Sequence, residues 1–205
     1  MIYWVLFHLF TNIVYNDVLD METTMLARLN SDHKHITILL NVLKVKYRKL
    51  AEGEAVNFNL IRDVVEYMQS YAEHSHHPLE DIIYNYYLEK VSQEDSPNKL
   101  AEEHHQLIDA SASLMSTLNL ILSDVVVSRE QLVVDLKEYV ALQERHMQYE
   151  DNTIFPLLAQ EMDEQDWGKV QELCSLKLID DPLFSDNDNV LFEELRDYIK
   201  DDEIF

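Results

Sequence analysis

The chain has 205 residues, of which 2 are glycine and 4 proline, and it carries 39 Asp and Glu against 16 Lys and Arg, a net charge of −23. Such acidity argues against nucleic acid as a partner, because phosphate binding needs a basic surface. The single cysteine, Cys174, excludes a disulfide within the chain and a metal site built from several thiolates. We therefore expect a helix-rich protein of ordinary domain size in the reducing cytoplasm.

The first 15 residues (MIYWVLFHLFTNIVY) are mostly apolar but too short to cross a bilayer as a helix. They also lack the basic start and the small-residue cleavage site of a signal peptide. Two interpretations stay open. Residues 1–24 form an N-terminal extension that packs as a helix on the rest of the protein, or the start codon is assigned too far upstream and Met21 or Met25 begins the protein. A membrane anchor is the less favoured interpretation.

Two stretches carry apolar residues in the alternating steps of four and three that mark the buried face of a helix. The first stretch runs from Leu29 to Leu50, and His33 occupies one of its core positions. The second runs from Leu100 to Ile121 with His104 at the corresponding place, and every position is displaced by 71 residues. The sequence thus predicts two long, related helices, each with one inward histidine.

Two further helices follow from capping signals. Asn57 is expected to cap a helix that runs to about Val91. Ser128, with Gln131 as its partner in a capping box, is expected to begin another that runs to about Met162. The helix with His104 is predicted to open at Ser96-Pro97, a capping residue followed by proline.

Short connections between long helices favour antiparallel neighbours. The predicted fold is therefore all-α: an up-down-up-down four-helix bundle over residues 25–162, built as a duplicated helical hairpin. Residues 163–205 are expected to add a C-terminal helical cover. It would consist of a short helix capped by Asp163, a loop, and a last amphipathic helix with the sequence VLFEELRDYI.

Two His-x-x-x-Glu pairs lie on the remaining predicted helices, 70 residues apart: His76 with Glu80, and His146 with Glu150. Residues four apart share one helix face, so each pair presents a nitrogen and a carboxylate in the same direction. With the two inward histidines, a face-to-face bundle would gather four imidazoles and two carboxylates. That donor set suits iron, manganese or zinc, and helical bundles hold two-metal sites in this way.

The alternatives are ordinary ones. A lone histidine on an apolar face is more often a hydrogen-bonded core residue, and a single His-x-x-x-Glu pair is usually exposed. Recurrence of both patterns at nearly one displacement favours the metal site. His77 and Asp81 also lie four apart, but their repeat partners, Met147 and Asp151, break the pairing. We therefore expect the remaining histidines of the bundle to lie around the ligand set or on the surface, namely His74, His77 and His105.

Two further expectations concern the surroundings of the ligands. Pro78 removes a helical amide beside His76, which predicts a local kink. Glu73 and Gln143 lie one turn before His76 and His146, where their side chains could orient these ligands.

At these residues the chain resembles the hemerythrin-like HHE cation-binding family over roughly residues 25–162. The motifs that carry the resemblance are L-x-x-D-H ending at His33, H-H-P-x-E-D from His76, E-H ending at His104, and H-x-x-x-E-D from His146. The resemblance implies a four-helix bundle around two iron ions joined by an oxo or hydroxo bridge, with manganese as an alternative metal. It assigns Glu80 and Glu150 as bridging ligands, and His33, His76, His104 and His146 as terminal ones.

One departure from the family pattern affects the expected function. Oxygen-carrying hemerythrins resemble each other in a His-x-x-x-His pair on the third helix, whereas Ile108 stands four residues after His104. A missing ligand leaves an open metal position, which favours reaction over simple carriage. We expect a di-iron protein that binds or senses O2, NO or peroxide, or handles iron. The alternatives are an iron-dependent oxidase or peroxidase, an iron–sulfur-cluster repair or iron-donor protein, and an acidic interaction bundle with a structural metal. Repair proteins of the family carry an N-terminal cysteine, which residues 1–24 lack.

Overall fold

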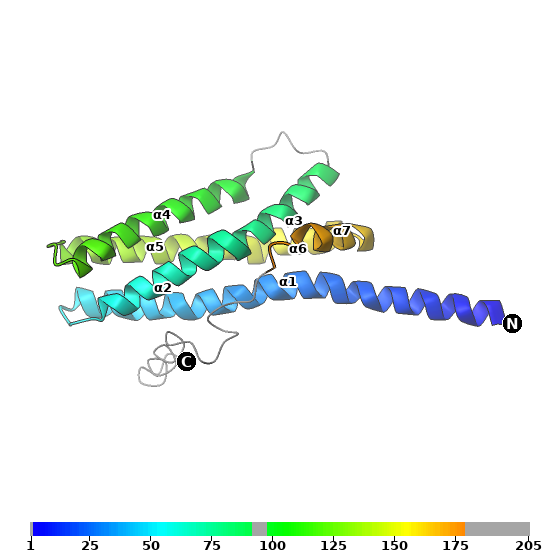
Figure 1. Ribbon diagram of the computed structural model, residues 1–205, viewed down its shortest axis with the longest axis horizontal. Helices are drawn as coiled ribbons and strands as arrows, with labels where there is room; N and C mark the ends of the chain where they lie inside the picture. The colour runs from blue at the N-terminus through cyan, green and yellow to red at the C-terminus, as the bar shows by residue number, and fades with distance from the viewer. Residues whose placement is uncertain (1, 92–97, 179–205) are drawn as a thin grey trace.

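The computed structural model describes residues 2–91 and 98–178, with side chains from residue 25 onward except residue 73. Every regular element in this part of the chain is helical, which confirms the predicted all-α class (Figure 1). The last predicted helix, VLFEELRDYI, lies outside the described residues.

In chain order the elements are α1 (Ile2–Ala51), α2 (Phe58–Tyr71), η1 (Ala72–His76), α3 (His77–Lys90), α4 (Lys99–Leu122), α5 (Arg129–Tyr149), η2 (Glu150–Ile154), α6 (Phe155–Glu161) and α7 (Glu164–Cys174). The segments η1 and η2 are single π-helical turns inside otherwise α-helical rods. The helix predicted from Asn57 to Val91 is therefore α2, η1 and α3 in succession.

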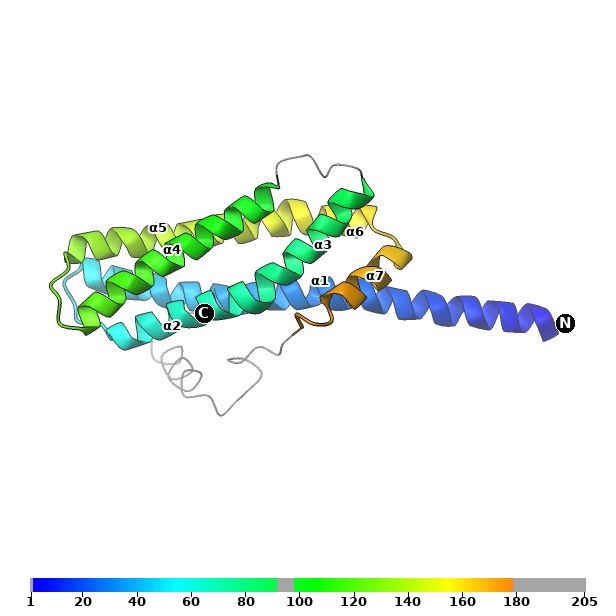
Figure 2. The ribbon, with the colours of Figure 1, turned by 45° about the horizontal axis from the view of Figure 1, so that its top comes forward.

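The helices pack side by side as a bundle (Figures 1 and 2). α1 packs against α5 and α7, and α2 packs against α4. The connection from α1 to α2 and the connection from α4 to α5 lie at the same end of the bundle, and α1 extends beyond the other helices at the opposite end (Figure 1). In the described ranges 2–91 and 98–178, no helix has both the length and the hydropathy needed to cross a bilayer.

The capping residues explain where the helices begin. Asn57 Oδ1 accepts from the amides of Asn59 and Leu60, and Ser128 Oγ accepts from the amide of Gln131, as predicted. Asp163 also caps α7 as predicted, in a full capping box with Asp166. Each cap satisfies an amide that the first helical turn leaves without a partner.

Two details of these predictions were wrong. The side chain of Gln131 donates forward to Asp135, at 2.8 Å, instead of completing a box with Ser128. The helix with His104 begins at Lys99, later than predicted, because Asn98 is its cap and accepts from the amide of Ala101 at 3.0 Å. A second residue with a capping side chain thus lay just beyond the expected start.

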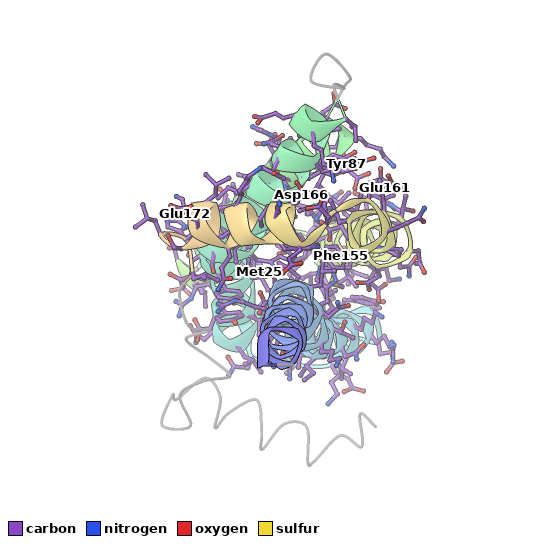
Figure 3. The ribbon with its side chains drawn as sticks, turned by 90° about the vertical axis from the view of Figure 1, so that its right-hand side faces the viewer. Met25, Tyr87, Phe155, Glu161, Asp166 and Glu172 are labelled. Carbon is purple, nitrogen blue, oxygen red and sulfur yellow. The ribbon has the colours of Figure 1, made fainter. Side chains whose placement is uncertain are left out.

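Two apolar clusters fill the bundle. One includes Leu43, Val64, Leu118 and Leu136, and the other includes Leu29, Leu79, Ile83, Phe155 and Trp167. Along α1 the second cluster ends at Leu29 and the first begins at Ile36, so that His33 falls between them. α7 crosses the side of the bundle and covers the second cluster, with Met25 and Phe155 beneath it (Figure 3). A short polar layer therefore separates two apolar cores.

Candidate metal centre

The polar layer contains all six residues predicted as ligands. They come from α1 (His33), η1 (His76), α3 (Glu80), α4 (His104), α5 (His146) and η2 (Glu150), and none is more than 5% exposed. Together with His77 they form two overlapping groups of donor atoms, each with all atoms within 4.8 Å of one another. One group is His33, His76, Glu80 and Glu150, and the other is His77, Glu80, His104 and His146. We refer to these seven residues as the metal cluster.

Each glutamate directs one oxygen towards each side of the cluster. Glu80 Oε1 lies 3.3 Å from His76 Nε2 and 3.7 Å from His33 Nε2. Its other oxygen, Oε2, lies 3.3 Å from His104 Nε2. A carboxylate with this orientation can bridge two cations.

Glu150 repeats this arrangement from the opposite helix. Its Oε2 lies 3.2 Å from His33 Nε2, whereas its Oε1 lies 3.2 Å from His146 Nε2 and 3.6 Å from His104 Nε2. The two carboxylates thus span the same two positions, one on the side of His33 and one on the side of His104.

The inner atoms of the cluster are buried without hydrogen-bond partners. Within the described part of the chain this holds for both oxygens of Glu80 and Glu150, for Nε2 of His33, His104 and His146, and for Nδ1 of His77. Leaving one polar group buried and unpaired costs about 1–3 kcal/mol, and more when it is charged. So many unpaired atoms around one point fit a set of cation ligands, because a metal would satisfy all of them together.

On its outer side each predicted histidine ligand contacts a carboxylate. Nδ1 of His33 lies 2.8 Å from Asp151, that of His76 lies 3.2 Å from Asp32, that of His104 lies 2.9 Å from Asp81, and that of His146 lies 3.1 Å from Glu103. A carboxylate only accepts, so Nδ1 carries a proton, and Nε2 is the nitrogen that faces inward, where it can bind a metal once its own proton has left. We call Asp32, Asp81, Glu103 and Asp151 the carboxylate ring.

The ring was missed by the sequence analysis, although it has a sequence signal. Each of its members is adjacent to a predicted ligand, and they recur at the same displacements: Asp32 with Glu103, and Asp81 with Asp151. The residues expected in this orienting role do not take it as far as they are described. Gln143 is buried but donates to the hydroxyl of Tyr139, and the side chain of Glu73 lies outside the described residues.

His77 lies in the cluster, where the sequence analysis did not place it as a ligand. Its ring stacks on His104 with 4.1 Å between centroids and lies 5.6 Å from the ring of His146. The repeat was misleading here, because the partner of His77 is Met147, a core residue. His74 and His105 are exposed, as expected for residues outside the ligand set. Ile108 is 36% exposed, so its position lies outside the cluster.

The π-turn η1 lies where the chain must turn two consecutive histidines inward. The amide of His77 bonds the carbonyl of Ala72, five residues back, and Pro78 follows directly. The expected kink at Pro78 is thus a π-turn, which opens the helix where proline cannot donate. The second π-turn has the same form, because the amide of Phe155 bonds the carbonyl of Glu150 just before Pro156.

The carboxylates dominate the electrostatics of the cluster. Burial lowers the pKa of His33, but its bond to Asp151 and the nearby Glu150 and Glu80 raise that pKa to about 12. Burial likewise lowers the pKa of His104, yet Asp81 and the two glutamates raise it to about 11. Burial works against ionisation of Glu80, while the surrounding histidines hold its pKa well below the usual range. The cluster therefore attracts positive charge strongly.

The pKa of His77 moves in the opposite direction. Burial lowers it well below 6.5, and the charge of His104 lowers it further. His77 is therefore a neutral imidazole, the form in which histidine binds a metal.

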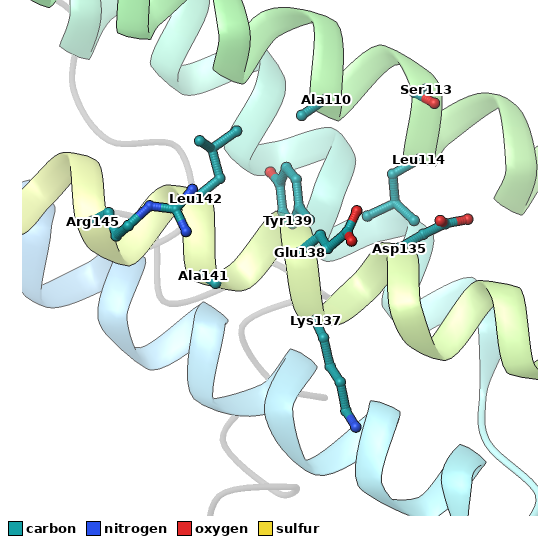
Figure 4. A pocket seen from close by; sticks show the side chains of 10 residues that line it. All are labelled: Ala110, Ser113, Leu114, Asp135, Lys137, Glu138, Tyr139, Ala141, Leu142 and Arg145. Atoms are coloured by element: carbon teal, nitrogen blue, oxygen red, sulfur yellow. The ribbon is translucent and has the colours of Figure 1, made fainter.

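A groove between α4 and α5 lies away from the inner face of the cluster. It has a volume of about 680 Å³ and is lined by residues such as Tyr139, Leu142 and Arg145, none of them from the metal cluster (Figure 4). A smaller cavity of about 110 Å³, which shares Leu142 and Arg145 with the groove, borders His146 and Glu103. It has room for only a few atoms next to the cluster.

Comparison with known proteins agrees with this geometry. The family model of the hemerythrin HHE cation binding domain matches residues 24–158. Among curated proteins and among solved structures, the searches find no match. The matched range contains the whole metal cluster and the whole carboxylate ring.

Proposed function

Because the chain belongs to the hemerythrin HHE cation-binding domain family, we propose that its metal cluster holds two iron ions and that the protein binds or senses O2, NO or a peroxide. The observation that carries the proposal is the division of the oxygens of Glu80 and Glu150 between two groups of histidines. Two shared carboxylates with imidazoles on both sides suit a pair of iron or manganese ions.

The two ends of the proposed site differ in their number of nitrogen donors. His33 and His76 serve one end, whereas His77, His104 and His146 serve the other. His77 would thus supply the fifth histidine that Ile108 does not. A metal with six positions keeps more of them free at the end of His33, where a small ligand would bind.

The proposal includes the arrangement and location expected from the sequence. We count four rods, namely α1, α2 with η1 and α3, α4, and α5 with η2 and α6. These rods would form an up-down-up-down bundle, an order supported by the path of the chain in Figures 1 and 2. The buried, single Cys174, whose pKa burial raises to about 11, suits a protein of the reducing cytoplasm.

Metal analysis and optical spectroscopy on the full-length protein test the proposal. After anaerobic loading with ferrous iron and exposure to air, we expect two irons per chain and the near-ultraviolet absorption of a bridged ferric pair. A stoichiometry of zero or one would overturn it. Exposure of the loaded protein to NO and to hydrogen peroxide then distinguishes ligand binding from the alternative of peroxide turnover.

A double variant supplies the matched control. Glu80→Ala with Glu150→Ala should abolish binding of both irons, because each carboxylate has one oxygen beside histidines on either side of the cluster. Glu89→Ala with Glu138→Ala removes the same charge from exposed positions and should leave two irons bound. Equal iron content in the two double variants would contradict the assignment of the bridging residues.

A further inference from the structure

We propose that the carboxylate ring stabilises the more oxidised state of the metal pair and that its four members are positioning residues, which act through the histidines and do not bind the metals. The inference rests on the proposed metal pair and adds to it the residues that set its reduction potential. Three properties of the ring support it: its closed path through the bundle, its charge, and its absence behind His77.

The ring is closed. Asp32 of α1 bonds His76 of η1, and Asp81 of α3 bonds His104 of α4. The path continues from Glu103 of α4 to His146 of α5, and from Asp151 of η2 back to His33 of α1. In every rod, one carboxylate thus accepts a hydrogen bond from a histidine of the next rod, and one histidine donates to a carboxylate of the rod before. Each bond fixes the ring plane and the tautomer of one ligand.

The charge of the ring favours the higher oxidation state. Together with Glu80 and Glu150, which would bind the metals, it gives six carboxylates, four of which lie behind the ligand imidazoles. Two ferrous ions carry four positive charges and two ferric ions carry six, so oxidation by one electron per metal brings the centre closer to neutrality. Carboxylates that accept from Nδ1–H also make the imidazole more basic, which stabilises the more highly charged ion.

The histidine that lacks such a partner is His77. Its Nδ1 is one of the inner atoms of the cluster, and among the described residues its imidazole bonds no carboxylate, although it stacks directly on that of His104. The carboxylate ring therefore contacts four particular histidines and is not a general consequence of the acidic composition. Those four are the histidines that recur in both copies of the repeat.

Glu103 offers the clearest test. Its side chain is 21% exposed and borders the cavity of about 110 Å³, so that a substitution there leaves no charge stranded in an apolar core. Glu103→Gln keeps an oxygen that can accept from His146 but removes the charge, whereas Glu103→Ala removes both. Glu102→Gln removes the same charge from the neighbouring, exposed position, which contacts no histidine of the cluster.

The experiment compares these three variants as iron-loaded, full-length proteins. Spectroelectrochemical titration should show a higher reduction potential for Glu103→Gln and Glu103→Ala, and a clearly smaller shift for Glu102→Gln. Metal affinity should fall about 10- to 100-fold in Glu103→Ala, the range for outer partners of ligands, and should recover largely in Glu103→Gln. Equal potentials in Glu103→Gln and Glu102→Gln would overturn the proposal.

A second readout separates this inference from the identity of the metal. In the zinc-loaded protein, the Nδ1 proton of His146 should give a low-field NMR resonance that shifts in Glu103→Gln and disappears in Glu103→Ala. If the wild-type chain binds zinc but no pair of irons, the proposed function fails while this readout still tests the positioning role. An unchanged resonance in both Glu103 variants would overturn that role.

Discussion

Tyr71 donates a hydrogen bond of 3.0 Å to Asp32 Oδ1, and the other oxygen of Asp32 accepts from His76 Nδ1 at 3.2 Å. Arg28 in turn donates to the hydroxyl of Tyr71 at 3.3 Å. Burial and the charge of Asp32 raise the pKa of Tyr71, which keeps its hydroxyl protonated. Asp32 is only 3% exposed, whereas Asp81 and Asp151 reach solvent. The hydroxyl of Tyr71 therefore supplies to Asp32 the hydrogen bond that water can supply to those two carboxylates.

Tyr71→Phe should therefore weaken both the fold and the metal site. It leaves one oxygen of a buried carboxylate unpaired, at a cost of about 1–3 kcal/mol. Urea unfolding of the metal-free protein and chelator competition of the loaded protein measure the two effects. Tyr84→Phe removes a hydroxyl from a half-buried ring that stacks on Tyr87 and should change neither. Equal results for the two variants would show that the bond from Tyr71 to Asp32 contributes nothing.

His77→Ala should weaken metal binding at one end of the cluster only. The group with His104 and His146 loses one of its three imidazoles, whereas the group with His33 keeps all of its donors. We expect the affinity for one of the two metals to fall roughly tenfold or more, since the loss of even an outer partner has that effect. Stepwise titration with chelator competition resolves the two metals. The exposed His74 provides the control, and a His77→Ala titration identical to that of His74→Ala would exclude His77 from the site.

Metal loading should release protons even at pH 8.5. In the metal-free protein His33 and His104 have pKa values raised to about 12 and about 11, so both are charged at a pH at which ordinary histidines are neutral. A metal binds the lone pair of Nε2, so His33 and His104 must each lose the Nε2 proton. Titration with zinc in weak buffer should release at least two protons per chain, and a bridging hydroxide adds its own. A release below two protons would contradict the raised pKa values.

The same pKa values fix the sign of the pH effect on the metal-free fold. Both lie above the value of 6.5 for an unfolded histidine, so the folded state holds protons that the unfolded state loses. The resulting stabilisation is complete below pH 6.5 and is lost as the pH rises through 11 to 12. The urea midpoint of the metal-free protein should therefore fall on the alkaline side, and the metal-loaded protein should not show this fall.

The turns after α1 and α4 predict opposite effects of two substitutions. Gly53 and Asp124 both have positive φ angles, 82° and 60°, and the amide that follows each bonds a carbonyl five residues back. Gly53→Ala should cost about 1 kcal/mol, because an L side chain is strained in this conformation and its Cβ would lie 3.3 Å from Arg129 Nη1. Asp124→Gly should stabilise by up to about 1 kcal/mol for the same reason. Urea unfolding measures both, and a stabilising Gly53→Ala would refute the argument.

Local patterns were enough to predict the helices, because their signals are contained in short stretches of sequence. The seam from Leu29 to Leu50 shows the helical period, and Asn57 shows the cap. The predicted ligands came together because two related hairpins must face each other to bury those seams. The carboxylate ring could not be predicted in the same way, since each of its bonds joins two different rods. His77 was missed because repeat symmetry was used as a criterion for ligands, whereas its position in the cluster depends on the π-turn before it.

The two π-turns also explain why the displacement between corresponding residues of the two halves is 71 in some segments and 70 in others. Helix ends correspond at a displacement of 71: α1 and α4 end at Ala51 and Leu122, and α3 and α6 end at Lys90 and Glu161. The displacement is 70 for the segments that hold the ligand pairs, from the end of η1 in the first half and up to the start of η2 in the second, as for Glu80 and Glu150. A π-turn accommodates one extra residue without turning the rest of the rod.

The first half gained its extra residue upstream of the ligands and the second half gained it downstream. The two His-x-x-x-Glu pairs therefore stay in phase with each other, although the helix ends around them correspond at a different displacement. The two halves are thus equal in length but are not interchangeable at the centre, and only the first half contributes two consecutive histidines to the cluster.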